Sequence, residues 1–267
     1  MQIVFLIFLF ITGACFGSFL CCQARRLHLS SSKRKTLGSR SVCLHCHYQL
    51  KWYDNLPLVS WLVLKGKCRK CQKSIGATEF FAELGAAITF LSIGTTIDVT
   101  TAGPLAWGTF LAVLLLVILF IFLSIYDGLY GELPTPVLFA SIICAVLVLL
   151  LHEVSLLLEH PFHTDFILHP LLSVLTLGGL YLFLYAISKG RWVGDCDWLL
   201  GTAIGIALFD PWLALIVLFL SNTLACLVGY PITKSKKIKK IHFGPFLVAA
   251  FIITYVFSDI FYALLSL

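Results

Sequence analysis

The chain has 267 residues, of which 60% are hydrophobic and only 12% charged, with a mean hydropathy of +0.98. A water-soluble domain has nearer a quarter charged residues, so the composition excludes an ordinary soluble protein. The formal net charge of +6 could indicate a nucleic-acid partner. However, no basic stretch is interleaved with the stacking aromatic residues that single-strand binders use. We therefore expect a membrane protein with no nucleic-acid partner.

Apolar stretches recur along the chain, and most are long enough to cross a hydrocarbon core of about 30 Å. They predict an all-α polytopic membrane protein with about eight transmembrane helices. A break at Asp210-Pro211 follows the short sixth span, and seven spans with one long bent helix are the alternative. No positive residue precedes the first apolar run, so we expect a retained helix there rather than a cleaved signal. The expected spans are about 3–22, 79–97, 104–126, 136–151, 168–188, 198–209, 212–230 and 243–266.

The basic residues gather in three regions of the sequence. Twelve of the 19 Lys and Arg lie in 25–73, two in 189–191 and the last five in 234–240. With eight spans, these regions fall on one side of the membrane, whereas the loops on the other side carry acidic residues and no Lys or Arg. The positive-inside rule makes the basic side cytoplasmic. The net charge then reflects topology.

The one sizeable polar segment, 23–78, contains two C-x2-C pairs. Each pair is typical of a tight turn that brings two sulfurs together, and two such turns complete a tetrahedral zinc site. Basic surroundings favour the thiolate that a metal requires, and a cytoplasmic location argues against disulfides. We therefore predict a small zinc module with a structural metal. Its ligands are Cys43, Cys46, Cys68 and Cys71.

Between the cysteine pairs runs an apolar stretch, 56–64, with the aromatic residues Trp52, Tyr53 and Trp61 in or beside it. This stretch could pack the small module, or it could lie in the interface of the membrane. Both interpretations stay open at the level of the sequence.

Three aspartates lie at the predicted cytoplasmic ends of spans. Asp127 ends the third span, and Asp195 and Asp197 open the sixth. Ionisable residues in such places often mark a functional site. Two carboxyls a few ångströms apart share one proton, so that one can act as a base and the other as an acid, as in aspartic proteases. Taken alone, the residues also fit helix caps or a proton relay in a transporter.

Five segments follow one another in the order found in a known family. They are GACFGSFLCCQARRL (13–27), CLHCHYQLKWYDNLPLVSWLVLKGKCRKC (43–71), FFAELG (80–85), DGLYGELP (127–134) and KIHFGPFLVAA (240–250). Together they resemble the prepilin peptidases, the type IV leader peptidase family of intramembrane aspartic proteases of the GxGD type. The 43–71 segment, which is similar to the family's cytoplasmic zinc-type module, is the most specific of the five. The resemblance runs over almost the full length of the chain.

The resemblance implies that Asp127 is the first catalytic aspartate. The second ends a G-x-G-D motif in the family, and here the sequence departs from the pattern. If Asp195 were the second aspartate, Trp192 would replace the first glycine. If Asp197 is the second aspartate, Cys196 replaces the second glycine.

The residues downstream favour Asp197. In the family, small residues follow the aspartate at intervals of four along one helix face, which lets helices approach closely. From Asp197 these intervals fall on Gly201 and Gly205, whereas the same intervals from Asp195 meet no glycine. Asp195 is then expected to be a helix cap or a supporting group. Leu199 stands where the family has a lysine.

By resemblance, the function is that of an aspartic endopeptidase that removes the basic leader peptide from type IV prepilins or pseudopilins. Cleavage is expected at the cytoplasmic face of the bacterial inner membrane, so the implied partners are these substrates and the lipid bilayer. Many family members also methylate the new N-terminus with S-adenosylmethionine. No glycine-rich nucleotide loop supports this activity here, and it stays open. The implied division is 1–22 as transmembrane helix 1, 23–78 as the four-cysteine zinc module and 79–267 as the transmembrane protease domain.

Two other classes of function stay open. A proton- or ion-coupled transporter would use the aspartates as a relay, but it leaves the cysteine pairs unexplained. A catalytically inactive family member could act as an assembly scaffold, because the side chain of Cys196 crowds the catalytic approach and Leu199 replaces a lysine. A cleavage assay separates both from the enzyme.

Overall fold

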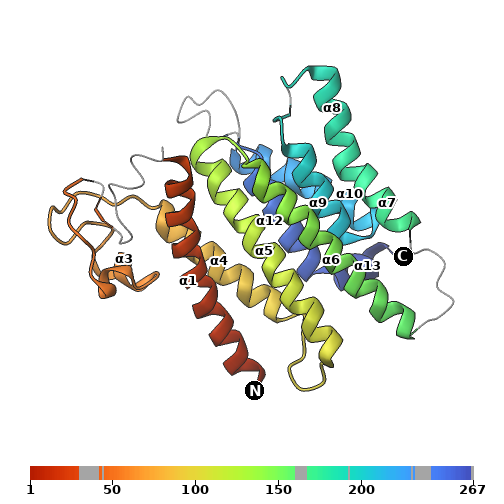
Figure 1. The fold of residues 1–267 in the computed structure, drawn as a ribbon, viewed down its shortest axis with the longest axis horizontal. Helices are drawn as coiled ribbons and strands as arrows, with labels where there is room; N and C mark the ends of the chain where they lie inside the picture. The colour runs from red at the N-terminus through yellow and green to blue at the C-terminus, as the bar shows by residue number, and fades with distance from the viewer. Residues whose placement is uncertain are drawn as a thin grey trace. The chain divides into compact units, whose positions relative to one another are not determined.

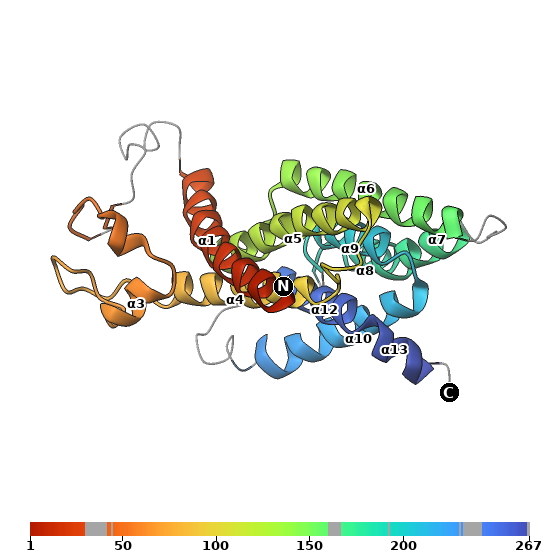
Figure 2. The same cartoon turned by 90° about the horizontal axis from the view of Figure 1, so that it is seen from below.

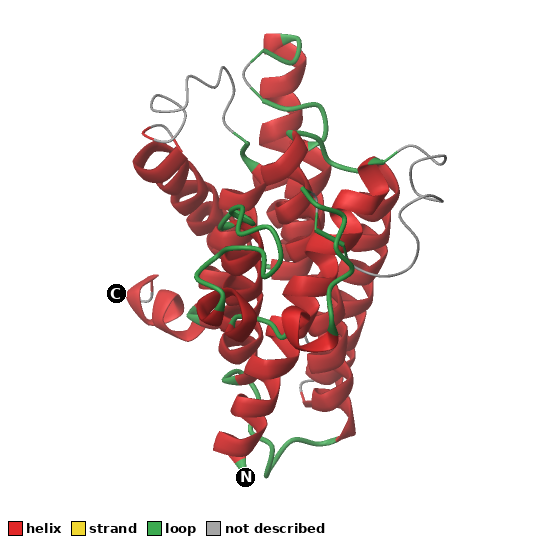
Figure 3. Cartoon of the chain, turned by 90° about the vertical axis from the view of Figure 1, so that its left-hand side faces the viewer, coloured by secondary structure: helices red, strands yellow, loops and turns green. Residues whose placement is uncertain are grey.

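A computed structural model describes residues 1–29, 42–43, 45–159, 167–191, 193–229, 231 and 242–265. Trp192 and the basic loop 234–240, both used in the sequence analysis, lie outside the described residues. Within the described ranges the chain is helical and has no β-strand, only two isolated β-bridges (Figure 3). The residues form two compact units, Met1–Thr95 and Thr96–Leu267.

The first unit is built on two antiparallel helices, α1 (Gln2–His28) and α4 (Thr78–Gly94). Glycines allow their backbones to approach closely. A Cβ added at Gly13 would lie 2.6 Å from the carbonyl oxygen of Ala86, and one at Gly17 would lie 2.7 Å from the Cα of Glu83. A small module connects the two helices and contains η1 (Trp52–Asn55) and α3 (Val59–Val63) (Figures 1 and 2).

The second unit contains the remaining helices. Aromatic and aliphatic side chains fill its core: Phe120 and Phe251 meet edge to face with their centroids 5.2 Å apart, and Leu200 and Leu247 are fully buried. Of the two short π-helical turns, η2 lies between α7 and α8, and η3 follows α10. The elements are α5 (Pro104–Tyr130), α6 (Thr135–Glu159), α7 (Leu168–Val174), η2 (Leu175–Gly179), α8 (Leu180–Ser188), α9 (Asp197–Leu208), α10 (Pro211–Leu224), η3 (Ala225–Gly229), α12 (Gly244–Val256) and α13 (Ser258–Leu265).

Among the described residues, five helices are long and apolar enough to cross a membrane, or six if α12 and α13 form one broken span. These last two helices meet at a bend of 74°, a break that the sequence did not predict. Helices lie at the expected second and sixth spans, α4 and α9, but with 17 and 12 residues neither is long enough to count among these candidate spans. The chain is therefore a helical, multi-pass membrane protein.

The helix break predicted at Asp210 and Pro211 is present. The carboxylate of Asp210 accepts hydrogen bonds from the backbone N–H groups of Trp212, at 2.7 Å, and Leu213, at 3.3 Å. An aspartate that satisfies the free N–H groups of a helix start is a strong N-cap. The sixth and seventh predicted spans are thus separate helices, α9 and α10, rather than one long bent helix.

Candidate functional site: a carboxylate pair and a four-cysteine cluster

Asp127 is a buried carboxylate near the C-terminal end of α5. The dipole of its own helix disfavours a negative charge there. The side chain compensates by reaching another helix start, since its Oδ2 accepts a hydrogen bond of 2.9 Å from the backbone N–H of Gly244, the first residue of α12. A Cβ at Gly244 would lie 2.9 Å from this oxygen. The close approach therefore requires glycine at position 244.

Asp197 is the first residue of α9 and is also buried. Its Oδ2 accepts a hydrogen bond of 2.9 Å from the backbone N–H of Gly194, three residues earlier. The carboxylate thus folds back on the turn that leads into its own helix. The start of α9 supplies the positive end of a helix dipole, which favours the ionised side chain.

The two predicted catalytic aspartates come from different helices of one unit, and the charge of Asp197 acts on the carboxyl of Asp127. Tyr181 of α8 lies beside both segments. Its ring meets that of Phe243, the residue before Gly244, edge to face with centroids 5.6 Å apart, and the charge of Asp197 acts on its hydroxyl. Two buried carboxyls that interact in this way can hold one proton between them.

The predicted small-residue face of α9 packs closely against α7 and η2. A Cβ at Gly205 would lie 2.9 Å from the carbonyl oxygen of Ser173 and from the Cα of Val174. A Cβ at Gly201 would lie 3.1 Å from the ring of Tyr181. Ser173 closes the contact, because its hydroxyl donates a hydrogen bond of 2.7 Å to the carbonyl of Gly205. The small-residue face of α9, which begins at Asp197, therefore sets the distance between α9 and the α7–η2 segment.

Asp195 differs from the expectation of a helix cap on α9. It lies in the turn before the helix and is exposed, while the N-cap position is occupied by Cys196 without a side-chain cap hydrogen bond. Its backbone carbonyl accepts a hydrogen bond from the indole N–H of Trp198 at 3.0 Å. Cys196 has φ −119° and ψ 1°. This backbone conformation suits any L-residue, so the replacement of a family glycine there causes no strain.

In the first unit, the four predicted metal ligands come together. The sulfurs of Cys43, Cys46, Cys68 and Cys71 all lie within 4.8 Å of one another. Those of Cys43 and Cys71 are 3.9 Å apart, and those of Cys46 and Cys68 are 4.0 Å apart. A tetrahedral zinc ion with Zn–S bonds of about 2.3 Å separates its sulfurs by about 3.8 Å. The donor set and its size therefore fit a zinc ion.

The two cysteine turns share one backbone pattern. In the first, the N–H of Cys43 donates to the carbonyl of Tyr48 at 2.9 Å, and the N–H of His47 donates back to Cys43 at 3.0 Å. In the second, the N–H of Cys68 donates to Lys73 and the N–H of Gln72 donates back to Cys68, both at 2.9 Å. The residue after each pair, His47 or Gln72, has a positive φ. The pattern makes the module an approximate repeat of one turn.

The surroundings of the cluster favour the thiolate of Cys43 but not that of Cys46. The backbone N–H of Tyr48 lowers the pKa of Cys46, but burial and hydrogen bonds with the other three thiols raise it to about 11. Burial of the Cys43 thiol opposes ionisation, but the backbone N–H groups of Cys46 and His45 point at its sulfur and outweigh this, so the pKa of Cys43 is lowered to about 7. The carboxylate of Asp54 contacts the second cysteine turn. Its Oδ1 accepts a hydrogen bond of 2.8 Å from Nε of Arg69. This bond joins η1 to the second C-x2-C pair.

Two features of the carboxylate site were missed at the sequence level. The KIHFGPF segment was noted only for its resemblance, yet Gly244 supplies the N–H that holds Asp127. Tyr181 carried no signal in an apolar run, and only the packing of α8 brings it beside Asp197. A glycine followed by proline at a helix start was the one available clue, since proline suits the first turn of a helix.

Comparison with known proteins shows the family to which the chain belongs. Residues 11–97 match the family model described as Bacterial Peptidase A24 N-terminal domain. Over 228 residues, which are 82% of this chain and 72% of the relative, the chain is 32% identical to the prepilin leader peptidase/N-methyltransferase of Aeromonas hydrophila. The protein of that name from Aeromonas salmonicida strain A449 is 31% identical over the same shares.

A shorter match has a higher sequence identity. The chain is 38% identical over 89 residues to the prepilin leader peptidase/N-methyltransferase of Myxococcus xanthus, which is 33% of this chain and 26% of that relative. No solved structure matches the chain at the level at which these relatives do. Since identity above 30% extends over most of this chain and most of the Aeromonas relative, the chain belongs to the prepilin leader peptidase/N-methyltransferase family, peptidase A24.

Proposed function

We propose that the protein is an intramembrane aspartic endopeptidase in which Asp127 and Asp197 form the catalytic pair. The observation that carries this proposal is the pair itself: two buried carboxyls from separate helices, each held by a glycine N–H, with one charge acting on the other. Structural carboxylates at helix ends are normally solvated. Burial of two of them in one helical unit costs stability, and such costly buried carboxyls in membrane helices typically mark a functional site.

The proposed mechanism uses one shared proton. The ionised carboxyl takes a proton from a water molecule, which attacks the carbonyl carbon of the peptide bond, while the protonated carboxyl donates to the carbonyl oxygen. Protonation of the departing amine then breaks the C–N bond. The N–H groups of Gly194 and Gly244 each occupy one carboxylate oxygen, Oδ2 of Asp197 and of Asp127. The other oxygen of each carboxyl is left to face the water.

The proposed substrates are type IV prepilins or pseudopilins, as the names of the relatives indicate. A prepilin joins a basic leader to an apolar helix, so its scissile bond lies at the membrane surface. The chain is a multi-pass protein of the bacterial cytoplasmic membrane. We propose that all eight predicted segments span it, with α4 and α9 as short spans and the 23–78 module on the cytoplasmic side. The protease domain would then be residues 79–267.

We further propose that Cys43, Cys46, Cys68 and Cys71 hold a structural zinc ion. Four thiolates complete its coordination and leave no position for substrate, which is the arrangement of a structural site. The ion would fix the two cysteine turns against each other. Methylation of the new N-terminus with S-adenosylmethionine is a second proposed activity, supported by the names of the relatives alone.

Cleavage of a prepilin co-expressed with the protein tests the peptidase proposal. Asp127→Asn and Asp197→Asn each remove one carboxyl of the pair, and we expect a loss of about 10⁴-fold or more in rate, comparable to that from loss of one catalytic group. Asp195→Asn is the matched control. It changes an exposed aspartate two residues from Asp197 and should keep most of the activity.

The outcomes separate the competing functions. Inactivation by Asp195→Asn with full activity of Asp197→Asn would overturn the assignment of the second aspartate. An unmodified protein that cleaves no prepilin, in a membrane where it is stably present, would favour the inactive scaffold. Proton flux into liposomes that depends on Asp127, without proteolysis, would favour the transporter.

A further inference from the structure

The short helix α3 in the first unit has an exposed apolar face. Val59, Leu62 and Val63 recur at the spacing of one helix face, and they are 54%, 59% and 70% exposed. Most other exposed apolar side chains among the described residues lie on the long apolar helices, although Trp52 and Leu56, close to α3 in the sequence, are exposed as well. The three apolar side chains of α3 lie in the polar segment 23–78, where exposure of apolar surface to water is unfavourable. The face therefore requires an occupant.

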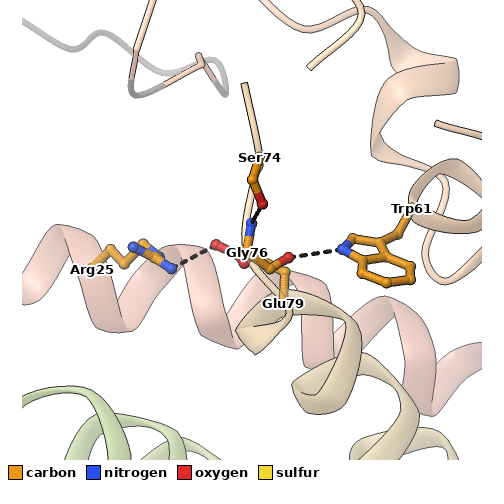
Figure 4. Close-up of polar contacts among 5 residues, drawn as sticks. All are labelled: Arg25, Trp61, Ser74, Gly76 and Glu79. Carbon is orange, nitrogen blue, oxygen red and sulfur yellow. Dashed lines mark hydrogen bonds and ion pairs between the residues drawn. The ribbon is translucent and has the colours of Figure 1, made fainter. Parts of the chain in front are cut away.

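The opposite side of α3 is fixed to the start of α4. The indole N–H of Trp61 donates a hydrogen bond of 2.8 Å to the carbonyl of Gly76, two residues before α4 (Figure 4). The Trp61 ring packs on that of Phe80 with centroids 4.6 Å apart. The backbone N–H of Leu58, just before α3, donates to Oε2 of Glu83 at 2.7 Å. These contacts set both the position and the direction of the helix.

The same contacts fix the depth of α3 relative to the membrane helices of its unit. Arg25 near the end of α1 pairs with Glu79 in the first turn of α4 at 2.6 Å, which marks the charged ends of both helices (Figure 4). Glu83 lies one turn, or about 6 Å, further along α4. It is also hydrogen-bonded to Ser18, within the apolar part of α1. In Figure 1, α3 accordingly lies at the same height as part of α1 and does not extend beyond the C-terminal end of α1.

The charges around α3 suit an anionic surface. Asp54 is the one acidic residue in the segment 23–78, and Arg69 pairs with it. Lysines remain on the exposed surface, among them Lys65 directly after α3 and Lys67 beyond it. The headgroups of anionic phospholipids attract such residues within a Debye length of the membrane. A basic leader peptide would be repelled by the same surface.

We propose that α3 is an interfacial membrane anchor, with Val59, Leu62 and Val63 inserted at the boundary between headgroups and acyl chains. Lys65 contacts the phosphate groups of anionic lipids above them. Apolar side chains next to lysines are the composition of helices that lie in this interface. The anchor holds the four-cysteine module against the membrane, an arrangement that goes beyond the peptidase function and does not depend on it.

Photo-crosslinking in the reconstituted full chain tests the anchor. Val63 is replaced by benzoylphenylalanine, and the protein is placed in nanodiscs of phosphatidylglycerol and phosphatidylcholine. We expect lipid adducts by mass spectrometry, with phosphatidylglycerol enriched about twofold or more over its bulk share. Lys65→Gln and 0.5 M salt should each reduce that enrichment. The matched control carries the photo-reactive residue at Gln72, an exposed position on the second cysteine turn, and should give no lipid adduct.

The outcomes are decisive in both directions. Lipid adducts from position 63 but not from position 72 support the anchor. Adducts with a second copy of the chain or with a co-purified pilin would overturn it, as would equal labelling at both positions. Replacement at Val59, which shares the face, repeats the test should the Val63 variant fold poorly. Because the readout is lipid labelling, it is made equally in Asp127→Asn protein, so its failure and a failure of the peptidase proposal are distinguishable.

Discussion

The four-cysteine cluster and the carboxylate pair are built in opposite ways. The cysteines come from two similar turns, each closed by backbone hydrogen bonds that span no more than five residues. The carboxylates are held by Gly194 and by Gly244, and the second of these bonds joins residues 117 positions apart. The cluster therefore depends on local conformation, and it would depend as well on the zinc ion proposed for it. The pair depends on how helices pack across the whole second unit.

This difference predicts how each site fails. Loss of one ligand should loosen the small module, because little apolar core supports it and its fold relies on the metal. The carboxylate pair should instead tolerate removal of the metal and respond to changes of a few tenths of an ångström in helix packing. Substitutions in the two regions should therefore differ in the size of their effects.

Cys43→Ser should have the largest effect on stability. Structural zinc contributes on the order of 10 kcal/mol in small metal-dependent domains, so loss of one thiolate should abolish zinc binding and expose 42–77 to limited proteolysis. Elemental analysis of the purified protein measures the metal. Cys226→Ser, at an exposed cysteine outside the cluster, is the control and should keep both metal and protease resistance. A zinc content unchanged in Cys43→Ser would contradict the four-cysteine site.

Gly244→Ala should reduce peptidase activity about 100-fold with little loss of fold. The new Cβ would lie 2.9 Å from Oδ2 of Asp127, which forces the carboxyl or the start of α12 to move. Small displacements of a catalytic group cost about this factor. Gly128→Ala is the matched control, since its Cβ would lie 3.9 Å from Pro245 and make an ordinary contact. Equal activity of the two variants would remove Gly244 from the site.

Gly205→Ala should destabilise the second unit by about 1–3 kcal/mol, the usual cost of overpacking. Its Cβ would meet the backbone of Ser173 and Val174 at 2.9 Å, and backbone cannot rotate away. Gly179→Ala, whose Cβ would make contacts of 3.5 Å or more, should be neutral or slightly stabilising. Denaturation of the purified protein in mixed micelles measures the difference. A Gly205 variant as stable as the Gly179 variant would argue against close packing of α9.

Removal of the Arg25–Glu79 ion pair should have the smallest effect. The pair is about one-third exposed, and such pairs contribute about 0–1 kcal/mol. A double-mutant cycle of Arg25→Gln and Glu79→Gln measures the coupling free energy directly. A coupling well above 1 kcal/mol would mean that the pair is desolvated at the membrane surface.

Much of this protein was readable from the sequence. The length of the apolar stretches predicted the helices, and the bounds of α5 and α9 differ from the expected spans by a few residues at most. The C-x2-C pairs predicted the convergence of four sulfurs, which the structure confirms. Both predictions rest on local properties, namely the length of an apolar stretch and the conformation of a C-x2-C turn. A segment adopts these properties largely independently of the rest of the fold.

Contacts between helices that are distant in the sequence became visible only in the structure. It brought the Gly244 N–H to Asp127, put Tyr181 beside Asp197 and bent the last span between α12 and α13. It also tied Trp61 of the 56–64 stretch to the residue Gly76 before α4 and left Val63 exposed. None of these follows from a pattern in one segment, because each depends on which faces of different helices meet. Local sequence thus predicts the helices and the side chains that they carry, whereas the packing of helices decides which of those side chains meet.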